Sequence, residues 1–502
     1  MHLLAIQLSR VNKYKEQIME PILGPIVGGV TNNKTKVWVF WNSAGREEEI
    51  PQCDLYKDES CKYKISTTPF QTVSSSVHKN ESINGLAGLA KLDLPPNLEQ
   101  VYFKIRLGSA EEQNDQIYTI RPFPEPNSNI DTLSFALISC HRPVYQKDKD
   151  EKITVPMWRF LREEMLRHNC SFLIQAGDQV YSDYKGFNAW EWSLGEKSPE
   201  KRLWYYRQVY LKSWSYQEIN EVFRRFPQYM IWDDHEITNG WGSNMEHSDK
   251  EHQSIFEIAR QAYIEFQHCH NPDPLRSGEL YFTFNYGPVA FLFMDLRGHR
   301  LISLYDNKTP SDTFPLAGKE QWDDIEAWLK SSIVQQSKLL FVITSVPVCH
   351  LSRKLGSFGI FKNDVRDQWS TPHNKKEKRI LLNLLYDWSG DTRKPVFILG
   401  GDVHVGTVAQ MIEKESGKTI HQITSSPITN APAFLLDLVL QYFSSEFEFH
   451  LDQNRLVSAK IVKRYRKRNF AIIKIQFSGD QPKVELYMYE KGKKEPEIYP
   501  FI

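Results

Sequence analysis

The most restrictive feature of the sequence is a regular alternation, after about residue 130, of short apolar segments with longer amphipathic ones. Short apolar runs are typical of buried strands, whereas Trp158, Leu161 and Met165 recur at the spacing of one helix face. Strands that alternate with helices favour a largely parallel sheet that is covered by helices on both faces. We predict strands at 134–139, 171–176, 228–232, 289–294, 339–345 and 396–399, and helices at 155–167, 201–223, 252–268, 318–332 and 376–388.

Residues 24–125 precede this region and show strand patterns instead. Apolar and polar residues alternate along several runs, as in half-buried strands, and nothing in the range has helical periodicity. We therefore predict an all-β, Ig- or fibronectin-like sandwich at 24–125, after an N-terminal extension at 1–23. The proline-rich stretch 121–127 predicts a stiff linker to a larger α/β domain at 130–502.

The composition excludes several classes of function. Lys and Arg (62) balance Asp and Glu (62), so the whole molecule has no net charge that attracts nucleic acid, and we predict no specific nucleic-acid partner. The six cysteines include no CxxC pair, which argues against a disulfide scaffold or a zinc ribbon. The apolar stretch 433–440 is too short to cross a bilayer, and the first ten residues lack signal-peptide features. We expect a soluble protein that is cytoplasmic or otherwise intracellular.

Polar side chains that can bind metals or transfer protons follow nearly every predicted strand. In open α/β sheets, sites form outside the carboxyl ends of the strands, so we expect these side chains to converge on one crevice. The five runs are Ser139-Cys-His-Arg142, Gly177-Asp-Gln-Val-Tyr181, Trp232-Asp-Asp-His-Glu236, Asp295-Leu-Arg297 and Gly400-Gly-Asp-Val-His404.

Taken singly, most of these runs have an ordinary structural explanation. Asp178 after a glycine could cap a turn or helix, and Cys140 could be a small buried hydrophobic residue. Asp402 and His404 could form a structural pair. The run 233–236 is harder to explain, because four ionisable residues after an apolar strand are costly to crowd together unless a cation offsets their charge. Together, the runs favour a metal site.

The ordered set of runs resembles the PhoD-like phosphatases and phosphodiesterases, a branch of the calcineurin-like metallophosphatase superfamily. The resemblance covers about residues 24–480 and includes the opening Gly24-Pro-Ile-Val-Gly28. It implies an α/β fold, the αββα metallophosphatase sandwich, after the small all-β domain. It also implies an alkaline phosphatase or phosphodiesterase, which hydrolyses phosphomonoester or phosphodiester bonds with a metal-activated water. Two alternatives stay open: a phospholipase-like diesterase that acts on lipid headgroups, and a catalytically inactive binding scaffold.

The resemblance implies two metal ions and the residues that hold them. Cys140 as a thiolate and Tyr181 as a phenolate would bind ferric iron (Fe3+), and Asp178 would bridge the two metals. Asp234 stands where many relatives carry a metal-binding Asn. The implied metal ligands are Cys140, Asp178, Tyr181, Asp234, Asp402 and His404.

Two departures from the wider superfamily concern the second metal. The segment 345–347, Ser-Val-Pro, lacks the His that many relatives carry shortly before a Pro, and Asp402 stands where many relatives have His. Both changes favour oxygen-rich coordination. Calcium, magnesium and manganese all suit such ligands, and the resemblance implies calcium beside the iron.

Two further residues are implied to act on the substrate, which we expect to be a small phosphoester or a lipid headgroup. His235 would be the general acid or would hold the phosphate, and Arg297 would contact phosphate oxygens through its guanidinium fork. A basic run at 460–468 precedes a predicted strand at 469–477. We interpret the run as a solvated edge; the alternative is a patch that steers a polyanionic substrate.

Overall fold

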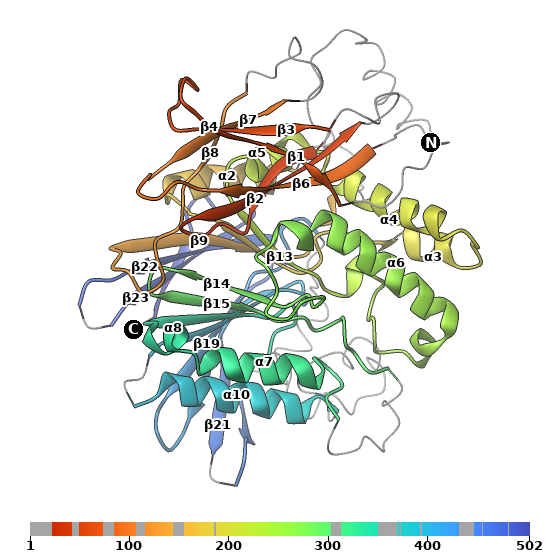
Figure 1. The fold of residues 1–502 in the computed structure, drawn as a ribbon. Helices are drawn as coiled ribbons and strands as arrows, with labels where there is room; N and C mark the ends of the chain where they lie inside the picture. The colour runs from red at the N-terminus through yellow and green to blue at the C-terminus, as the bar shows by residue number, and fades with distance from the viewer. Residues whose placement is uncertain are drawn as a thin grey trace.

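The N-terminal part of the chain is stacked on a larger part, in which two sheets lie between layers of helices (Figure 1). The structure is a computed structural model. It describes residues 23–42, 50–73, 85–106, 116–143, 155–184, 187–302, 313–349, 369, 371, 373–391, 394–430, 446–453, 455–479 and 481–501. The predicted extension at 1–23 therefore lies outside the described residues, apart from Leu23.

Two antiparallel sheets of four strands form the N-terminal part, as the strand patterns predicted. In order across the sheets, the first contains β1 (Leu23–Gly28), β2 (Lys34–Asn42), β6 (Gly85–Asp93) and β5 (Gln71–Thr72), and the second contains β4 (Lys64–Pro69), β3 (Gln52–Tyr56), β7 (Val101–Arg106) and β8 (Tyr118–Ile120). Trp38 on β2 donates its indole N–H to the carbonyl of Glu265 at 2.8 Å. The first sheet therefore also packs against the larger part.

Two mixed sheets form the larger part. In order across the sheet, the first contains β13 (Gln228–Ile231), β10 (Leu173–Ala176), β9 (Thr132–Ile138), β22 (Asn469–Gln476), β23 (Lys483–Glu490) and β24 (Glu497–Phe501). The second contains β14 (Phe282–Tyr286), β15 (Val289–Phe293), β16 (Leu339–Ile343), β17 (Val396–Gly400), β19 (Thr419–Thr424), β18 (Gly406–Glu413), β21 (Leu456–Tyr465) and β20 (Glu446–His450). Each predicted strand is present within two residues of its predicted bounds. Because β9, β10 and β13 are parallel, as are β15, β16, β17 and β19, their carboxyl ends share one edge of each sheet.

Helices cover the outer faces of the two sheets. They are α2 (Pro156–Arg167), α3 (Ala189–Ser193), α4 (Pro199–Trp214), α5 (Gln217–Phe223), α6 (Lys250–Phe266), α7 (Lys319–Leu329), α8 (Ser332–Gln336) and α10 (Lys375–Ser389). Figure 1 shows α2 and α5 between the N-terminal part and the first sheet, and α7 and α10 on the far side of the second.

The prediction of a single helix at 201–223 was wrong, because the range contains two helices, α4 and α5. The helix predicted at 318–332 corresponds to α7, which ends at Leu329. In the first range, α4 ends before Ser215, and Tyr216 is extended with φ −71° and ψ 136°. The side chain of Asn220 donates to the carbonyl of Trp214 at 2.8 Å, so it satisfies a helix-end acceptor at the break.

Strands β15, β16 and β17 place alternate side chains in two separate cores. Phe291 and Phe341 face the main core between the two sheets, whereas Leu292 faces a second core under α7 and α10. Phe135 of β9 meets Phe341 edge-on, with 5.1 Å between ring centroids, and so joins the two sheets. Burial on both faces explains why these strands are almost continuously apolar in the sequence.

The proline-rich stretch 121–127 is docked on the larger part. Phe123 is only 4% exposed, and its ring centroid lies 5.6 Å from that of Phe172 and 4.8 Å from that of Tyr286. Its backbone N–H donates to the carbonyl of Thr31 at 3.1 Å. Phe123 therefore anchors the predicted linker to both parts of the chain.

The basic run at 460–468 includes the second half of β21, and its interpretation as a solvated edge stays a prediction. β21 pairs with β18 from Val457 to Tyr465, whereas β20 pairs with it only from Leu456 to Lys460. Lys460 lies opposite Glu446 in register, and Lys463 forms an ion pair with Glu497. Acidic neighbours therefore offset part of the positive charge of the run.

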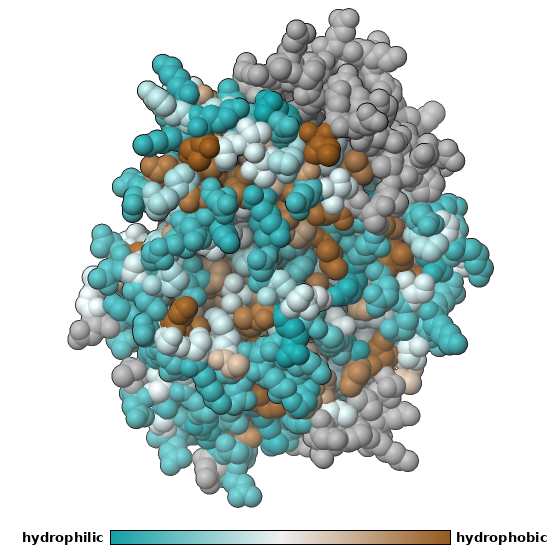
Figure 2. Space-filling view, viewed as in Figure 1, coloured by the Kyte–Doolittle hydropathy of each residue, from teal (hydrophilic) through white to brown (hydrophobic). Residues whose placement is uncertain are grey.

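The described surface is that of a polar molecule. Figure 2 shows hydrophilic residues over most of one face, with apolar residues scattered between them. None of the helices in the described ranges combines the length and apolar character that a membrane span requires.

Replacing Phe123 by Ala should lower the free energy of unfolding by about 3–5 kcal/mol, because the change leaves a cavity in an aromatic cluster. The measurement is urea denaturation followed by tryptophan fluorescence. The matched control is Tyr63→Ala, since the Tyr63 ring is 70% exposed and its loss should change stability by less than about 0.5 kcal/mol. Equal effects of the two substitutions would show that Phe123 does not hold the two parts together.

Candidate metal centre

The polar runs at the carboxyl ends of the strands meet at one place, as the parallel topology predicts. The Cys140 thiol, after β9, donates to Asp178 Oδ2 at 3.3 Å, and the Tyr181 hydroxyl donates to the same oxygen at 3.2 Å. The Tyr181 hydroxyl also lies 3.1 Å from Nε2 of His404, which follows β17. The ligand atoms of Cys140, Asp178 and His404 all lie within 4.8 Å of one another. A thiol, a phenol, a carboxylate and an imidazole therefore surround one space.

A group of carboxylates adjoins this space. Oxygens of Asp178, Asp233, Asp234 and Asp402 lie within 4.8 Å of one another, and so do ligand atoms of Asp178, Asp234 and His235. Asp178 belongs to every one of these groups, so its carboxylate lies between the soft ligands and the acidic ones. We call the combined set the Asp178 cluster: Cys140, Asp178, Tyr181, Asp233, Asp234, Asp402 and His404.

The Asp178 cluster contains all six residues that the resemblance implied as metal ligands, together with Asp233, which was not predicted. Asp233 directly follows β13 and opens the run of ionisable residues at 233–236. That crowding was the available signal for Asp233. The predicted set of metal ligands includes its neighbour Asp234 instead, because Asp234 stands where many relatives carry a metal-binding Asn.

Two glycines allow the strand ends to approach this closely. At Gly177, with φ +90°, a Cβ would lie 2.7 Å from the Cβ of Asp233. At Gly401, a Cβ would lie 2.4 Å from the Cβ of Ser139 and 2.5 Å from the carbonyl oxygen of Ala176. Any side chain at either position would therefore push the ligand-bearing turns apart.

Four residues of the Asp178 cluster have the left-handed backbone conformation that non-glycine residues rarely adopt. The φ angles are 57° at Cys140, 58° at Asp178, 63° at Asp402 and 54° at His404. Three of the other four described cases are Asn, which like Asp tolerates this conformation, whereas Cys140 has a side chain that does so less well. Such strain typically persists at sites where the surrounding structure holds a residue for function.

Glu236 joins two of the ligand-bearing turns from beneath. Its buried carboxylate accepts the backbone N–H of Asp178 at 3.1 Å and that of Gln179 at 2.6 Å, after β10. It also accepts the N–H of Asp233 at 2.8 Å, after β13. Glu236 therefore points away from the ligand space and fixes the spacing of Asp178 and Asp233.

The electrostatics of the Asp178 cluster fit bound cations. Asp178 Oδ1 and Asp234 Oδ1 are buried and have no hydrogen-bond partner among the described residues, which is costly for a carboxylate. Burial raises the pKa of Asp178, of the Cys140 thiol and of the Tyr181 phenol well above their usual ranges. A cation would reverse this effect, because it stabilises the deprotonated forms that bind metals.

His235 lies beside the cluster and is held by a residue that was not predicted. Its Nδ1 lies 2.9 Å from Asp183 Oδ1, and its ring centroid lies 4.0 Å from that of Tyr181. Burial opposes protonation of His235, but the carboxylates of Asp183, Asp234 and Asp178 outweigh it and raise the pKa of the imidazole well above its usual value. His235 can therefore carry a proton next to the ligand space. No sequence signal set Asp183 apart from any other acidic residue.

Arg297 faces the carboxylates instead of open space. Its side chain is fully buried, Nε donates to Asp233 Oδ1 at 2.5 Å, and Nη2 lies 3.8 Å from Asp234 Oδ1. Ser345, in the segment that lacks the expected His, also donates to Asp233 Oδ1, at 2.9 Å. The phosphate contact implied for Arg297 stays a prediction, whereas its observed contacts hold two acidic residues of the cluster.

Arg142 is a second cation close to the cluster, and it was not assigned a role from the sequence. Its guanidinium carbon lies 4.1 Å from the centroid of the Tyr184 ring and 5.6 Å from that of the Tyr181 ring. Unlike Arg297, Arg142 is only half-buried. It follows Cys140 by two residues, and this place in the run 139–142 was the sequence signal that Arg142 lies near the cluster.

Comparison with known proteins agrees with this geometry. The sequence profile of the PhoD-like phosphatases matches residues 135–485. Alkaline phosphatase D of Bacillus subtilis (strain 168) is 23% identical over 349 residues, which is 65% of this chain and 54% of that protein. The chain thus spans about half the length of that relative. A solved structure described as "Structure of PhoD" is similar in fold, with a TM-score of 0.67, 18% identity, and coverage of 97% of this chain and 90% of the other.

Removing metals with a chelator should lower the thermal midpoint of the protein, because the crowded carboxylates then lose the cations that offset them. A metal present at 100 times its dissociation constant stabilises the folded state by about 2.7 kcal/mol. In Asp178→Asn, metal should add little stability, whereas the metal-free variant should be at least as stable as the metal-free parent. The exposed Asp323→Asn is the control and should respond to metal like the parent. A midpoint that is insensitive to chelator in the parent would contradict the metal centre.

Proposed function

The chain belongs to the PhoD-like phosphatase family, and we propose that it hydrolyses phosphoester bonds at the Asp178 cluster. The observation that carries the proposal is the shared position of Asp178, whose carboxylate lies within 4.8 Å of both soft and acidic ligand atoms. One residue there can touch two cations at once. Two adjacent cations suit a phosphate group, which has several anionic oxygens to bind.

We propose that the two halves of the cluster hold different metals. Cys140, Tyr181 and His404, with Asp178, suit ferric iron, because thiolate and phenolate favour a trivalent or soft metal. The oxygens of Asp233, Asp234 and Asp402 suit a hard divalent ion, with calcium favoured and magnesium or manganese as alternatives. When bound, such metals would neutralise phosphate oxygens and lower the pKa of the attacking water.

The residues beside the cluster supply positioning and proton transfer in this proposal. His235, beside the cluster and in contact with the Asp183 carboxylate, is suited to donate a proton to the leaving-group oxygen. Asp183 holds the His235 ring through the 2.9 Å contact with Nδ1, so that Nε2 is the nitrogen left for the substrate. Arg142 has the exposure needed to reach a phosphate oxygen, and Arg297 fixes Asp233 and Asp234 from behind.

The proposed substrate is a small phosphomonoester or phosphodiester, with a lipid headgroup as the diester alternative. An inactive scaffold would be expected to have lost one of the shared ligands. The presence of Asp178 and His404 in one cluster therefore argues against that alternative.

Replacing His235 by Ala should lower kcat by about 10²- to 10⁴-fold on an alkyl phosphoester, because the alkoxide leaving group needs a proton. The loss should be much smaller on a nitrophenyl phosphoester, whose leaving group departs without one. His168→Ala is the matched control, since His168 contacts Tyr489 and not the cluster, and its activity should be unchanged. An equal loss on both substrates would show that His235 does not act as the proton donor. Assays on paired mono- and diesters decide the substrate class.

Protein loaded with ferric iron should be coloured, because phenolate and thiolate ligands give visible charge-transfer bands with Fe3+. Tyr181→Phe should bleach or shift the band, and Cys140→Ser should weaken iron retention. Tyr206→Phe is the control, because Tyr206 is also buried but donates to the carbonyl of Ile237. If both cluster variants keep the band and the full iron content of the parent, the iron assignment is wrong. Absorption spectra and elemental analysis measure both quantities without reference to activity.

A further inference from the structure

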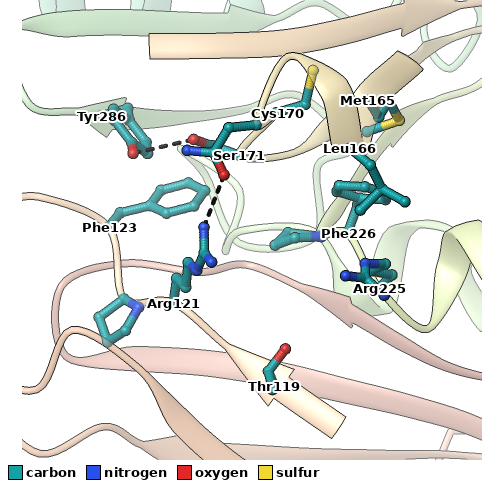
Figure 3. A pocket seen from close by; sticks show the side chains of 13 residues that line it. Thr119, Arg121, Phe123, Met165, Leu166, Cys170, Ser171, Arg225, Phe226 and Tyr286 are labelled. Carbon is teal, nitrogen blue, oxygen red and sulfur yellow. Dashed lines mark hydrogen bonds between the residues drawn. The ribbon is translucent and has the colours of Figure 1, made fainter. Parts of the chain in front are cut away.

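We propose that a pocket between the N-terminal sandwich and the larger part binds a small amphipathic anion, with an apolar body and one anionic head group. The pocket, which we call the junction pocket, has a volume of about 340 Å³. It lies between the linker at 121–123, the end of α2 with the following turn, the turn before β13, and Tyr286. Figure 3 shows these segments around it. The inference does not depend on the proposed hydrolysis.

The junction pocket is separate from the Asp178 cluster. Ser171 and Pro227 line the pocket and precede β10 and β13, whereas Asp178 and Asp233 follow those strands. The pocket therefore lies at the amino ends of these strands, and the Asp178 cluster lies at their carboxyl ends. At a rise of about 3.3 Å per residue, the span from Ser171 to Asp178 is roughly 20 Å. A ligand in the junction pocket cannot reach the metal ligands.

The charge of the junction pocket favours an anion. Two of its lining residues, Arg121 and Arg225, are cationic, and none is acidic. Arg121 is held in place, because it donates to Asn169 Oδ1 at 3.1 Å and to Gln100 Oε1 at 3.4 Å. The exposed guanidinium of Arg225 has no hydrogen-bond or ion-pair partner among the described residues. Either guanidinium can pair with a carboxylate, sulfate or phosphate head group.

The rest of the lining favours an apolar body on the same ligand. Phe123, Met165 and Phe226 are buried side chains that line the pocket, and Leu166 adds an apolar side chain that is 41% exposed. The pocket thus combines apolar side chains with polar ones, as an amphipathic ligand requires, and its volume falls within the range of about 300–1,000 Å³ for small-molecule sites. Two cations in one hollow are too few to track a polyanion such as nucleic acid.

A ligand in the junction pocket would contact both parts of the chain. Arg121 and Phe123 belong to the linker that follows the sandwich, whereas Arg225 and Phe226 belong to the larger part. Because the ligand binds only where these segments meet, binding should stabilise the contact between them.

The test is calorimetric titration of the full-length, metal-loaded protein with octanoate and with octyl sulfate. We expect at least one of them to bind, and the tighter of the two identifies the favoured head group. Inorganic phosphate serves as a control, because it is an anion without an apolar body. Its binding heat should be the same in the parent and in Arg225→Gln. Octyltrimethylammonium has the apolar body with the opposite charge and should not bind.

Two substitutions at exposed positions locate the binding. Arg225→Gln should weaken binding by about tenfold or more, as expected for loss of a charge-assisted contact. Leu166→Glu should do the same by placing a negative charge beside the pocket. Lys330→Gln, at a side chain that is 70% exposed on the helix α7 surface, is the control and should bind like the parent. Circular dichroism checks that all variants fold, and hydrolysis rates should not change.

The proposal is overturned if neither octanoate nor octyl sulfate binds at millimolar concentration. It is also overturned if Arg225→Gln and Leu166→Glu bind like the parent, or if octyltrimethylammonium binds as tightly as the anions. Loss of hydrolysis with binding retained would affect only the proposed function, so the two proposals fail separately.

Discussion

The repulsion among Asp178 and the three aspartates beside it, of which only Asp402 is partly exposed, is the physical constraint on which the rest of this structure depends. Their oxygens lie within 4.8 Å of one another, where like charges are costly unless cations lie between them. Several features of the fold make that arrangement possible. Glycines let the turns approach, Glu236 fixes their spacing through backbone N–H groups, and Arg297 offsets negative charge from behind.

The two packed sheets make such an arrangement possible because they provide a rigid support. Strands β15, β16 and β17 are buried on both faces, and Phe135 and Phe341 lock the two sheets against each other. The strained residues Cys140, Asp178 and Asp402 directly follow strands of this support. A less rigid frame would let the backbone relax from the left-handed conformation, and the ligands would no longer face one another.

The sequence was sufficient to predict the strands that carry the polar runs, because both depend on local patterns. Short apolar runs located these strands within two residues, and the polar runs at their carboxyl ends met as parallel topology requires. Features that depend on distant contacts were not predictable. The helix break at Ser215 depends on Asn220, which also accepts the N–H of Gly24, and the docking of the linker depends on an aromatic cluster from three other segments. Asp183 and the inward direction of Arg297 likewise follow only from packing.

The position of β22 has a consequence for how the protein is made. β22 pairs with β9, the strand that leads to Cys140, and Asn469 at its start donates its side-chain N–H to the carbonyl of Ser426 at 2.6 Å. Residues 469–476 lie well beyond His404, the last ligand in the chain. A growing polypeptide therefore emerges from the ribosome with every residue of the Asp178 cluster present before the sheet that supports Cys140 is complete. The cluster reaches its final geometry only when the C-terminal strands have closed the first sheet.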